Sequence, residues 1–286
     1  MSRQAYYQGR VRRRERDGRE AKALEVVRNE RRLQKRLGTR KLYDMYYEVF
    51  RKLRIGRDAL FDLLRRTKLL VRPRRTRHST THSDHGMRAA PNLLAGRHPP
   101  ERPNEVWASD ITYVRTGERH CYAALVTDCY SRKIVGFDLS DSLSVEGSLR
   151  ALRQALRARQ GQQSKPQQSE PIRPLIHHSD RGVQYACGAY RTALSRANAL
   201  SSMTSRGNPY ENPLAERING ILKDEYGLGD PFTDVTQARN ALREAVQLYN
   251  ERRPHNSLGK RTPAMAHAGE TGRYTPPEAE IYVNLF

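Results

Sequence analysis

The spacing of hydrophobic and polar residues predicts helices throughout the first quarter of the chain. From about Arg19, and again over residues 42–53, apolar residues recur at the interval of a helix face. The break Arg54-Ile55-Gly56-Arg57 follows, and a second helix is expected over residues 58–67. A helix, a tight glycine turn and a basic second helix are typical of a helix-turn-helix region, which binds DNA.

From Glu105 the pattern changes to short runs of β-forming residues. Strands are expected at residues 106–114, 121–127, 134–139, 174–178 and 200–203. Helices are expected at residues 145–159, 188–197, 212–226 and 235–251. Three strands, then helix, strand, helix, strand and helix, is the order of an RNase H-like α/β core, so the predicted fold class is α/β with a small all-α region in front.

These patterns divide the chain into five segments. Residues 1–37 form a basic N-terminal helical arm, for which a partly disordered arm is the alternative, and residues 38–72 form the helix-turn-helix region. Proline and turn residues dominate 73–104, which is therefore a linker. The catalytic core is expected over 105–255, and 256–286 is a C-terminal tail.

Charge changes this picture by indicating a partner. The chain of 286 residues has a net charge of +21, and its first 77 residues hold 26 Lys and Arg against 9 Asp and Glu. Such a basic region favours a polyanion. No apolar run approaches the roughly 20 residues of a spanning helix, and the N-terminus has no apolar signal core. Nucleic acid is therefore a better partner than a membrane.

Cysteine and histidine usage argues against a disulfide framework or a zinc site. The three cysteines, Cys121, Cys129 and Cys187, include no CxxC pair. His78, His82 and His85 lie close together in sequence but lack further ligands at zinc spacing, so solvated loop histidines are the default. We expect a reducing, cytoplasmic compartment.

Three acidic residues have the positions that a two-metal site requires. Two metal ions can stabilise the attacking and leaving oxygens of a phosphodiester, and magnesium prefers a few carboxylates plus water. Asp110 lies inside a predicted strand, where an unpaired acid is costly. Asp180 ends a strand, where α/β folds place ligands. Glu216 shares one face of a predicted helix with Asn219 and Lys223.

Each acid also has an ordinary explanation. Asp110 could be a satisfied strand acid, Asp180 a turn residue, and Glu216 a solvated helix residue. Asp128 also ends a strand and could replace one of the three, although a turn or cap is the simpler interpretation. Glu211 and Glu225 are rivals of Glu216.

Five ordered motifs give a more specific resemblance. They are WASDITYV, YAALVTDCYSRKIVGF, HHSDRGVQYAC, SMTSRGNPYENPLAERINGILKDEY and YNERRPHNSLGKRTP. Together they resemble the integrase-type core of the insertion-sequence-three family of transposases, specifically the second-reading-frame product (OrfB). Thirty-five residues separate Asp180 from Glu216, as in the family's DD(35)E motif. The resemblance covers Glu105 to about Pro263, and more loosely residues 38–94.

The resemblance implies a DNA transposase that uses two Mg²⁺ or Mn²⁺ ions. Asp110 would bridge both metals, while Asp180 and Glu216 would each bind one. The enzyme would nick the 3′ end of the element, and the freed 3′-OH would attack a second phosphodiester without a covalent enzyme intermediate. The partners would be double-stranded DNA (the terminal inverted repeats and the target) and further copies of the chain on that DNA, in the bacterial nucleoid.

Basic residues are candidates for holding that DNA. Those near the second predicted helix are Arg54, Arg57, Arg65, Arg66 and Lys68. Weaker candidates nearer the acids are Arg181, Lys223, Tyr185 and residues 252–255, for which a solvated face is about as plausible. Much of the affinity should be directed at phosphates and sensitive to salt.

The chain departs from the family pattern in two ways, and three alternative functions remain. Many relatives have Asp-Asn-Ala before the glutamate where this chain has Glu211-Asn212-Pro213, which touches the helix start and not the metal ligand. No upstream first-frame domain is evident, so the first-frame product is an expected partner. The alternatives are a nuclease that only hydrolyses, a catalytically silent DNA-binding regulator, and an RNA-binding protein; the last lacks RRM or KH motifs.

Overall fold

The computed structural model describes residues 2–71, 89–117, 119–163, 174–205 and 212–285. Contacts within the chain separate it into two compact units. The helical unit comprises Met1–Arg75, Arg252–Thr262 and Gly272–Phe286, and the sheet unit comprises Thr76–Glu251 and Pro263–Thr271. The three histidines considered for zinc, and Glu211, lie outside the described residues.

The helical unit is built on one long helix. Its elements are α1 (Arg3–Leu33), α2 (Thr39–Met45), α3 (Tyr47–Lys52), α4 (Arg57–Arg66), the 3-10 helix η2 (Asn256–Leu258) and α11 (Pro277–Leu285). Helix α1 begins at Arg3 rather than near Arg19, because Ser2 caps it: the Ser2 hydroxyl accepts a hydrogen bond from the Ala5 amide at 3.2 Å. Residues 2–18 are all exposed, so this part of α1 has no packed face.

The first helix expected in the helix-turn-helix region is divided in two. Tyr46 leaves helical geometry at φ −106° and ψ 34°, so α2 ends before it and α3 begins after it. The Tyr46 side chain is buried and donates a 2.6 Å hydrogen bond to Glu30 of α1. The expected turn is present, with Arg54 at φ 56°, and α4 follows it with Leu60, Leu63 and Leu64 buried.

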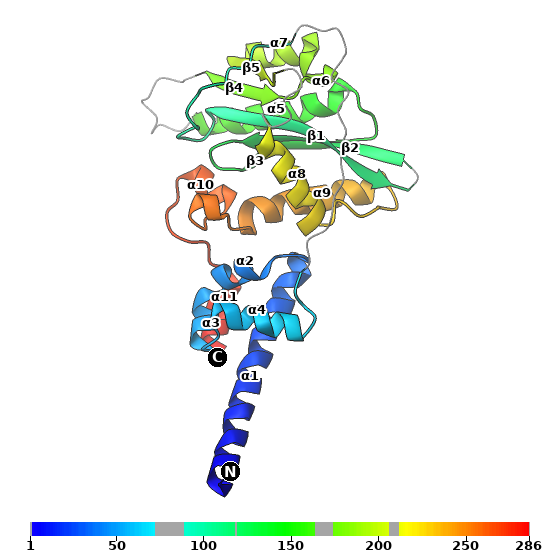
Figure 1. Cartoon of the computed structure of the whole chain (residues 1–286). Coiled ribbons are helices and arrows are strands. Elements are labelled where there is room, and N and C mark those ends of the chain that lie inside the picture. Colours follow the sequence, from blue (N-terminus) through cyan, green and yellow to red (C-terminus); the bar gives the residue numbers. More distant parts are fainter. Residues whose placement is uncertain (1, 72–88, 118, 164–173, 206–211, 286) are drawn as a thin grey trace. The chain divides into compact units, whose positions relative to one another are not determined.

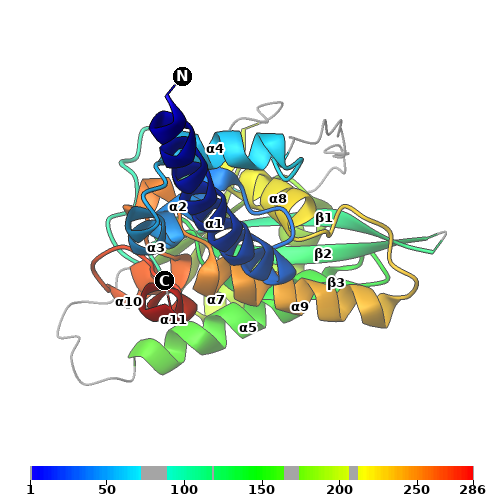
Figure 2. The same ribbon diagram turned by 90° about the horizontal axis from the view of Figure 1, so that it is seen from below.

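The C-terminal segment is not a separate tail. Ala279 and Tyr282 of α11 are buried in the apolar core of the helical unit with residues of α1 to α4. Tyr282 accepts a 2.5 Å hydrogen bond from Asn29, and α11 lies beside α3 in both views (Figure 1, Figure 2). The expectation of a tail over 256–286 was wrong because these apolar residues pair with a core about 230 residues earlier, which local spacing does not reveal.

The sheet unit contains five strands, as expected. They are β1 (Val106–Thr116), β2 (Arg119–Asp128), β3 (Ile134–Ser140), β4 (Leu175–Ser179) and β5 (Ala199–Met203), in the order β3-β2-β1-β4-β5. The first three strands form an antiparallel meander, whereas β4 pairs in parallel with both β1 and β5. The parallel strand β4, which has a strand on each side, is buried at every position.

Helices cover both faces of this sheet (Figure 1). One face packs on α5 (Val145–Gln163), α6 (Val183–Ala186) and α7 (Gly188–Arg196) around Trp107, and the other on α8 (Pro213–Glu225) and α9 (Val235–Arg252) around Leu125. Helix α5 approaches β3 so closely that a Cβ at Gly136 would lie 2.1 Å from the Ala151 carbonyl oxygen. Only glycine fits there.

The mixed α/β core expected from the sequence is therefore present. The two short helices that the sequence pattern did not predict in this unit are α6 and α10 (Pro263–Ala268), each too short to carry a periodic signal. None of the helices in the described segments combines the length and apolar character needed to cross a bilayer.

Candidate active site

Two aspartates meet because of the register between β1 and β4. Ser109 pairs with Ser179 as the last parallel partners, and the next residue on each strand is an aspartate. Asp110 lies inside β1 and Asp180 directly follows β4, so the two stand side by side where β4 ends, on strands that lie about 4.8 Å apart. The sequence placed each acid at a strand, and the pairing of the strands brings them together.

Local backbone contacts orient both aspartates. Asp110 is half-buried, and its Oδ1 accepts a 2.9 Å hydrogen bond from the Ile111 amide. Asp180 Oδ1 accepts a 3.0 Å hydrogen bond from the Gly182 amide, which turns the chain sharply after β4. A Cβ at Gly182 would lie 3.0 Å from that same oxygen, so glycine permits the turn.

Two asparagines fasten the helix of Glu216 to β1. At the start of α8, buried Asn212 donates through Nδ2 to the Ser109 carbonyl at 3.1 Å. Two turns later, Asn219 donates through Nδ2 to Asp110 Oδ2 at 2.7 Å. Glu216 lies between them on the same face of α8, and its side chain is exposed.

The three carboxylates act on one another electrostatically. Burial raises the pKa of Asp110 to about 7, and the negative charges of Asp180 and Glu216 add to the rise. Lys223 on α8 is half-buried, and burial lowers the pKa of its ammonium while the nearby charge of Asp110 opposes that shift. The sheet edge therefore concentrates negative charge, and Lys223 is a cation close enough to interact with it.

A neutral hydrogen-bonded cluster lies beneath the aspartates. His177 Nε2 is 2.7 Å from Ser109 Oγ and 2.9 Å from the Tyr190 hydroxyl. Complete burial lowers the pKa of His177 to about 3, so the ring is neutral at pH 7. Tyr185 packs edge-on against Tyr190 with ring centroids 5.3 Å apart. These contacts join residues of different elements, so the sequence pattern did not predict them.

No completed metal cage is present in the residues that the structure describes. Among them, no three His, Cys, Asp or Glu side chains converge closely enough to enclose an ion. Asp110 and Asp180 are neighbours, whereas Glu216 is exposed on α8 immediately after the segment 206–211, which lies outside the description. The candidate metal ligands are thus two neighbouring aspartates, Asp110 and Asp180, and a third carboxylate, Glu216, whose charge also raises the pKa of Asp110.

The rival acids have structural explanations or remain apart. Asp128 is fully buried, and its oxygens accept 2.7 Å hydrogen bonds from the amides of Asn104 and Ser131. It caps the turn after β2, which agrees with the simpler sequence interpretation. Glu225 is half-buried at the last turn of α8, nine residues beyond Glu216.

The basic candidates of the helical unit are surface residues. Arg54, Arg57, Arg65, Arg66 and Lys68 are all exposed. Arg57 pairs with Asp58 at 2.8 Å, Arg65 pairs with Asp62, and Arg66 pairs with Glu20 at 3.0 Å. Exposed ion pairs are worth about 0–1 kcal/mol, so phosphate groups can replace these carboxylates at little cost.

The basic candidates nearer the carboxylates differ from these. Arg181 is half-buried beside Asp180, and its Nε donates to the Thr204 carbonyl at 2.8 Å, which ties the loop after β4 to the end of β5. Arg252 is almost buried and binds Glu30 at 2.7 Å and Glu278 at 3.0 Å, and Arg253 is buried as well. Arg252 therefore has an internal role in the helical unit, and the interpretation of residues 252–255 as DNA contacts stays a prediction.

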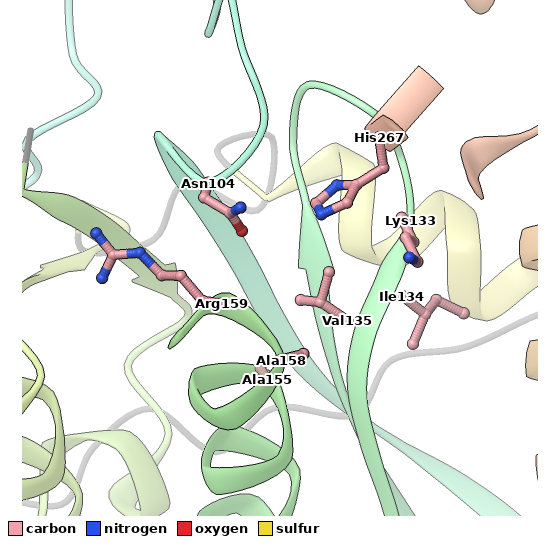
Figure 3. Close-up of a pocket in the computed structure, with 8 residues that line it drawn as sticks. All are labelled: Asn104, Lys133, Ile134, Val135, Ala155, Ala158, Arg159 and His267. Atoms are coloured by element: carbon pink, nitrogen blue, oxygen red, sulfur yellow. The ribbon is translucent and has the colours of Figure 1, made fainter. Parts of the chain in front are cut away.

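A cavity in the sheet unit lies apart from the carboxylates. It measures about 70 Å³ and lies between β3 and α5 (Figure 3). Its lining residues are Asn104, Lys133, Ile134, Val135, Ala155, Ala158, Arg159 and His267. In Figure 3 the Arg159 guanidinium points away from the other side chains, so the cations do not converge on one ligand.

Comparison with protein families gives two adjoining matches. Residues 100–209 match one model described as an integrase core domain, and residues 199–263 match a second model with the same description. Together they span β1 to α9 and include Asp110, Asp180 and Glu216. The mixed α/β sheet and these matches agree with the RNase H-like, integrase-type class expected from the sequence.

Curated relatives extend the similarity over most of the chain. The chain is 36% identical over 211 residues to the insertion element IS600 uncharacterized 31 kDa protein of Shigella sonnei, covering 73% of this chain and 74% of that protein. It is 31% identical over 201 residues to the putative transposase for insertion sequence element IS986/IS6110 of Mycobacterium tuberculosis, covering 70% of each. With transposase InsF for insertion sequence IS3A of Escherichia coli it shares 32% identity over 201 residues, covering 70% of this chain and 66% of that one.

Among solved structures, the HTLV-2 integrase catalytic core domain in complex with magnesium is 19% identical, with a TM-score of 0.44. That similarity covers 58% of this chain and 98% of the viral domain.

Proposed function

The chain belongs to the insertion-sequence-three family of transposases, and we propose that it nicks the 3′ ends of its element and joins them to target DNA. The observation that carries this chemistry is the register of β1 and β4, which sets Asp110 beside Asp180. Asn219 then links Asp110 to the helix that bears Glu216. These three acids are the proposed catalytic residues.

The donor set suits Mg²⁺ or Mn²⁺. Both ions favour carboxylate oxygens and water over a full protein cage. Burial, and then the negative charges of Asp180 and Glu216, raise the pKa of Asp110, and a bound cation would offset the repulsion between these carboxylates. Buried Asn219 Oδ1 also has no hydrogen-bond partner among the described residues, so a polar atom beside Asp110 is left for a bound ligand. Two ions held by Asp110, Asp180 and Glu216 would supply electrostatic stabilisation of the attacking and leaving oxygens.

The chain's own residues have distinct tasks in this proposal. Asp110 and Asp180 present a fixed pair of carboxylates at the sheet edge, because backbone amides hold one oxygen of each. Asn219 holds the second oxygen of Asp110 and so fixes the plane of that carboxylate. Lys223 is a cation close to Asp110 on the face of α8 that carries Glu216, where it would meet a DNA phosphate.

The helical unit supplies the proposed DNA-binding surface. Its exposed arginines on and before α4, together with the excess charge of the first 77 residues, favour the phosphate backbone of double-stranded DNA. We place the terminal repeats of the element there, with the 3′ end that is nicked, and then the target DNA that it joins, at the carboxylates. Because transposition pairs two ends, we further propose that copies of the chain assemble on DNA, with the first-frame product as an additional partner.

Conservative substitutions of the acids test the proposal. Asp110→Asn, Asp180→Asn and Glu216→Gln should each lower metal-dependent nicking of duplexes carrying the element's ends by at least about a hundredfold. Glu244→Gln is the matched control, since Glu244 is also an exposed helical glutamate but lies on α9. The readouts are nicked and joined strands on a denaturing gel, with Mg²⁺ and with EDTA.

The same gel distinguishes the alternatives. Wild-type rates in any of the three variants would show that the acid assigned to catalysis is not needed. Nicking without joined products identifies a nuclease that only hydrolyses. Binding to the ends without nicking identifies a silent regulator.

A further inference from the structure

A buried tyrosine hydroxyl within electrostatic reach of the two aspartates has no hydrogen-bond partner among the described residues. Tyr185 is on α6, five residues after Asp180, and only 3% of the residue is exposed. No described residue donates to or accepts from its hydroxyl. Buried polar groups without a partner are uncommon in native proteins, and each calls for an explanation such as a ligand.

The Tyr185 ring lies between buried aromatic residues and the turn that follows Asp180. The ring packs against Tyr190, at 5.3 Å between centroids, and against His177, at 6.2 Å. Its Cδ2 atom lies 3.4 Å from the position of a Cβ on Gly182, beside Asp180 Oδ1. Charges on Asp110 and Asp180 both reach the hydroxyl and disfavour its ionised form, after the larger effect of burial. The polar end of Tyr185 therefore belongs to the carboxylate site.

Tyr190 provides an internal comparison. It is a buried tyrosine of the same cluster, but its hydroxyl lies 2.9 Å from His177 Nε2 and is therefore satisfied within the protein. Tyr185 has no such contact with the cluster. One hydroxyl thus serves the packing of the core, and the other remains as a neutral donor next to two carboxylates.

We propose that Tyr185 is a positioning residue whose hydroxyl donates a hydrogen bond to an oxygen atom held at the Asp110–Asp180 pair. That oxygen belongs either to a water molecule on a divalent cation or to a DNA phosphate. A phenol is a strong donor that stays protonated there, so it can orient an oxygen without adding charge. The inference rests on the proposed function, because it requires a cation or phosphate at these carboxylates.

The test compares Tyr185→Phe with Tyr190→Phe in the full-length protein. Each substitution removes one oxygen atom and keeps the ring. Melting temperature, Mn²⁺ affinity by isothermal titration, affinity for an end duplex in Ca²⁺, and nicking kinetics are measured for wild type, both variants and Asp110→Asn. We expect Tyr190→Phe to lower the melting temperature, because it breaks the contact with His177. Tyr185→Phe should leave the melting temperature unchanged or raise it.

The two sources of the oxygen give different results. If the oxygen is cation-bound water, Tyr185→Phe weakens Mn²⁺ binding without DNA by about five- to tenfold. If it is a phosphate oxygen, Mn²⁺ binding stays at the wild-type value, while duplex affinity in Ca²⁺ and kcat for nicking fall by a similar factor. Either result supports the proposal.

Other results overturn it. Wild-type metal affinity, duplex affinity and kcat in Tyr185→Phe would show that the hydroxyl orients nothing. If Tyr185→Phe lowers the melting temperature and changes nothing else, the hydroxyl stabilises the core and does not orient a ligand. If Asp110→Asn loses Mn²⁺ binding while Tyr185→Phe is unchanged in every respect, the inference fails alone; if the wild type binds no Mn²⁺, the proposed function fails with it.

Discussion

At the residue scale, Asp110 combines the requirements of a metal ligand with a cost to the metal-free fold. It is tied to its own strand by the Ile111 amide and to α8 by Asn219, so it cannot turn away from the neighbouring acids. Two hydrogen bonds favour its charged form, yet burial and the charge of Asp180 prevail and raise its pKa to about 7. The free energy of unfolding of the metal-free protein must therefore change with pH as Asp110 gains or loses its proton.

The sign of that dependence follows from proton linkage. Asp110 has a pKa of about 4 in an unfolded chain and about 7 in the folded protein. Between these values the folded state holds a proton that the unfolded state has lost, so the free energy of unfolding falls as pH rises from about 4 through about 7, and then levels off. We expect the melting temperature of Asp110→Asn minus that of wild type, in EDTA, to increase over this window.

Two further measurements test whether the carboxylate of Asp110 causes this difference in melting temperature. Mg²⁺ at pH 8 should reduce it, because the cation relieves the repulsion only in the wild type. Asp141→Asn, at an exposed carboxylate, is the control for removing an acidic side chain. A constant difference for Asp110→Asn would mean that the folded state leaves the pKa of this carboxyl near 4.

At the element scale, α8 depends on two polar contacts for its position on β1. Asn212 and Asn219 both bond to β1, and the apolar side chains of Ile218 and Leu222 pack on the sheet behind them. Asn219→Ala should weaken Mn²⁺ binding by about tenfold, because a hydrogen bond to a carboxylate contributes about 1.5–3 kcal/mol.

The control for Asn219→Ala is Asn240→Ala. Asn240 is an exposed asparagine on α9 whose side chain accepts a 3.1 Å hydrogen bond from Arg243. Isothermal titration with Mn²⁺ measures both variants. Equal affinity in Asn219→Ala and wild type would show that the backbone alone orients Asp110.

The helical unit contains a buried ion pair and hydrogen bonds at the end of α9. Glu30 is fully buried and accepts hydrogen bonds from Arg252 at 2.7 Å and from Tyr46 at 2.6 Å. Arg252→Ala leaves a buried carboxylate without its cation, which costs about 3–5 kcal/mol. Urea denaturation should show this loss, whereas Arg243→Ala, an exposed arginine of the same helix, should change stability by less than about 0.5 kcal/mol. If Arg252→Ala leaves the free energy of unfolding unchanged, Arg252 does not stabilise the helical unit and remains a candidate for DNA contact.

At the scale of the whole molecule, the sequence predicted those features that depend on nearby residues. The five strands and the helices α5, α7, α8 and α9 have clear apolar periodicity, so their order and the α/β class were predictable. Asp110 and Asp180 could be placed at strands for the same reason. Residues 3–18 of α1 lack an apolar stripe, and the core partners of Tyr282 in α11 are far away in sequence, so neither helix was predictable in full.

The site shows the same division between local and distant determinants. That Glu216, Asn219 and Lys223 share one face follows from helical spacing alone. That Asn219 bonds to Asp110, and that the hydroxyl of Tyr185 lacks a partner while that of Tyr190 has one, depends on how separate elements pack. The elements that carry the acids were therefore predictable from the sequence, and the orientation of the carboxylates was not.

The division of charge along the chain predicts how DNA affinity depends on salt. Most of the net positive charge lies in the first 77 residues, and Arg65 and Arg66 on α4 are exposed but paired with Asp62 and Glu20. Each arginine that contacts a phosphate contributes about one unit to the slope of log affinity against log salt concentration. Arg65→Ala and Arg66→Ala should therefore each lower the slope by about 1 in fluorescence anisotropy with an end duplex, and leave kcat for nicking at saturating DNA unchanged.

The paired carboxylates allow a test in the opposite direction. Asp62→Asn removes the competitor of Arg65 and should strengthen binding to the duplex, because the arginine no longer exchanges one anion for another. Arg243→Ala removes one exposed positive charge from α9 and is the control for net charge. If Arg243→Ala lowers the slope as much as the α4 variants do, DNA responds to the total charge of the chain. If the effect is confined to α4 and Asp62→Asn tightens binding, the exposed face of α4 is the surface that holds the phosphate backbone.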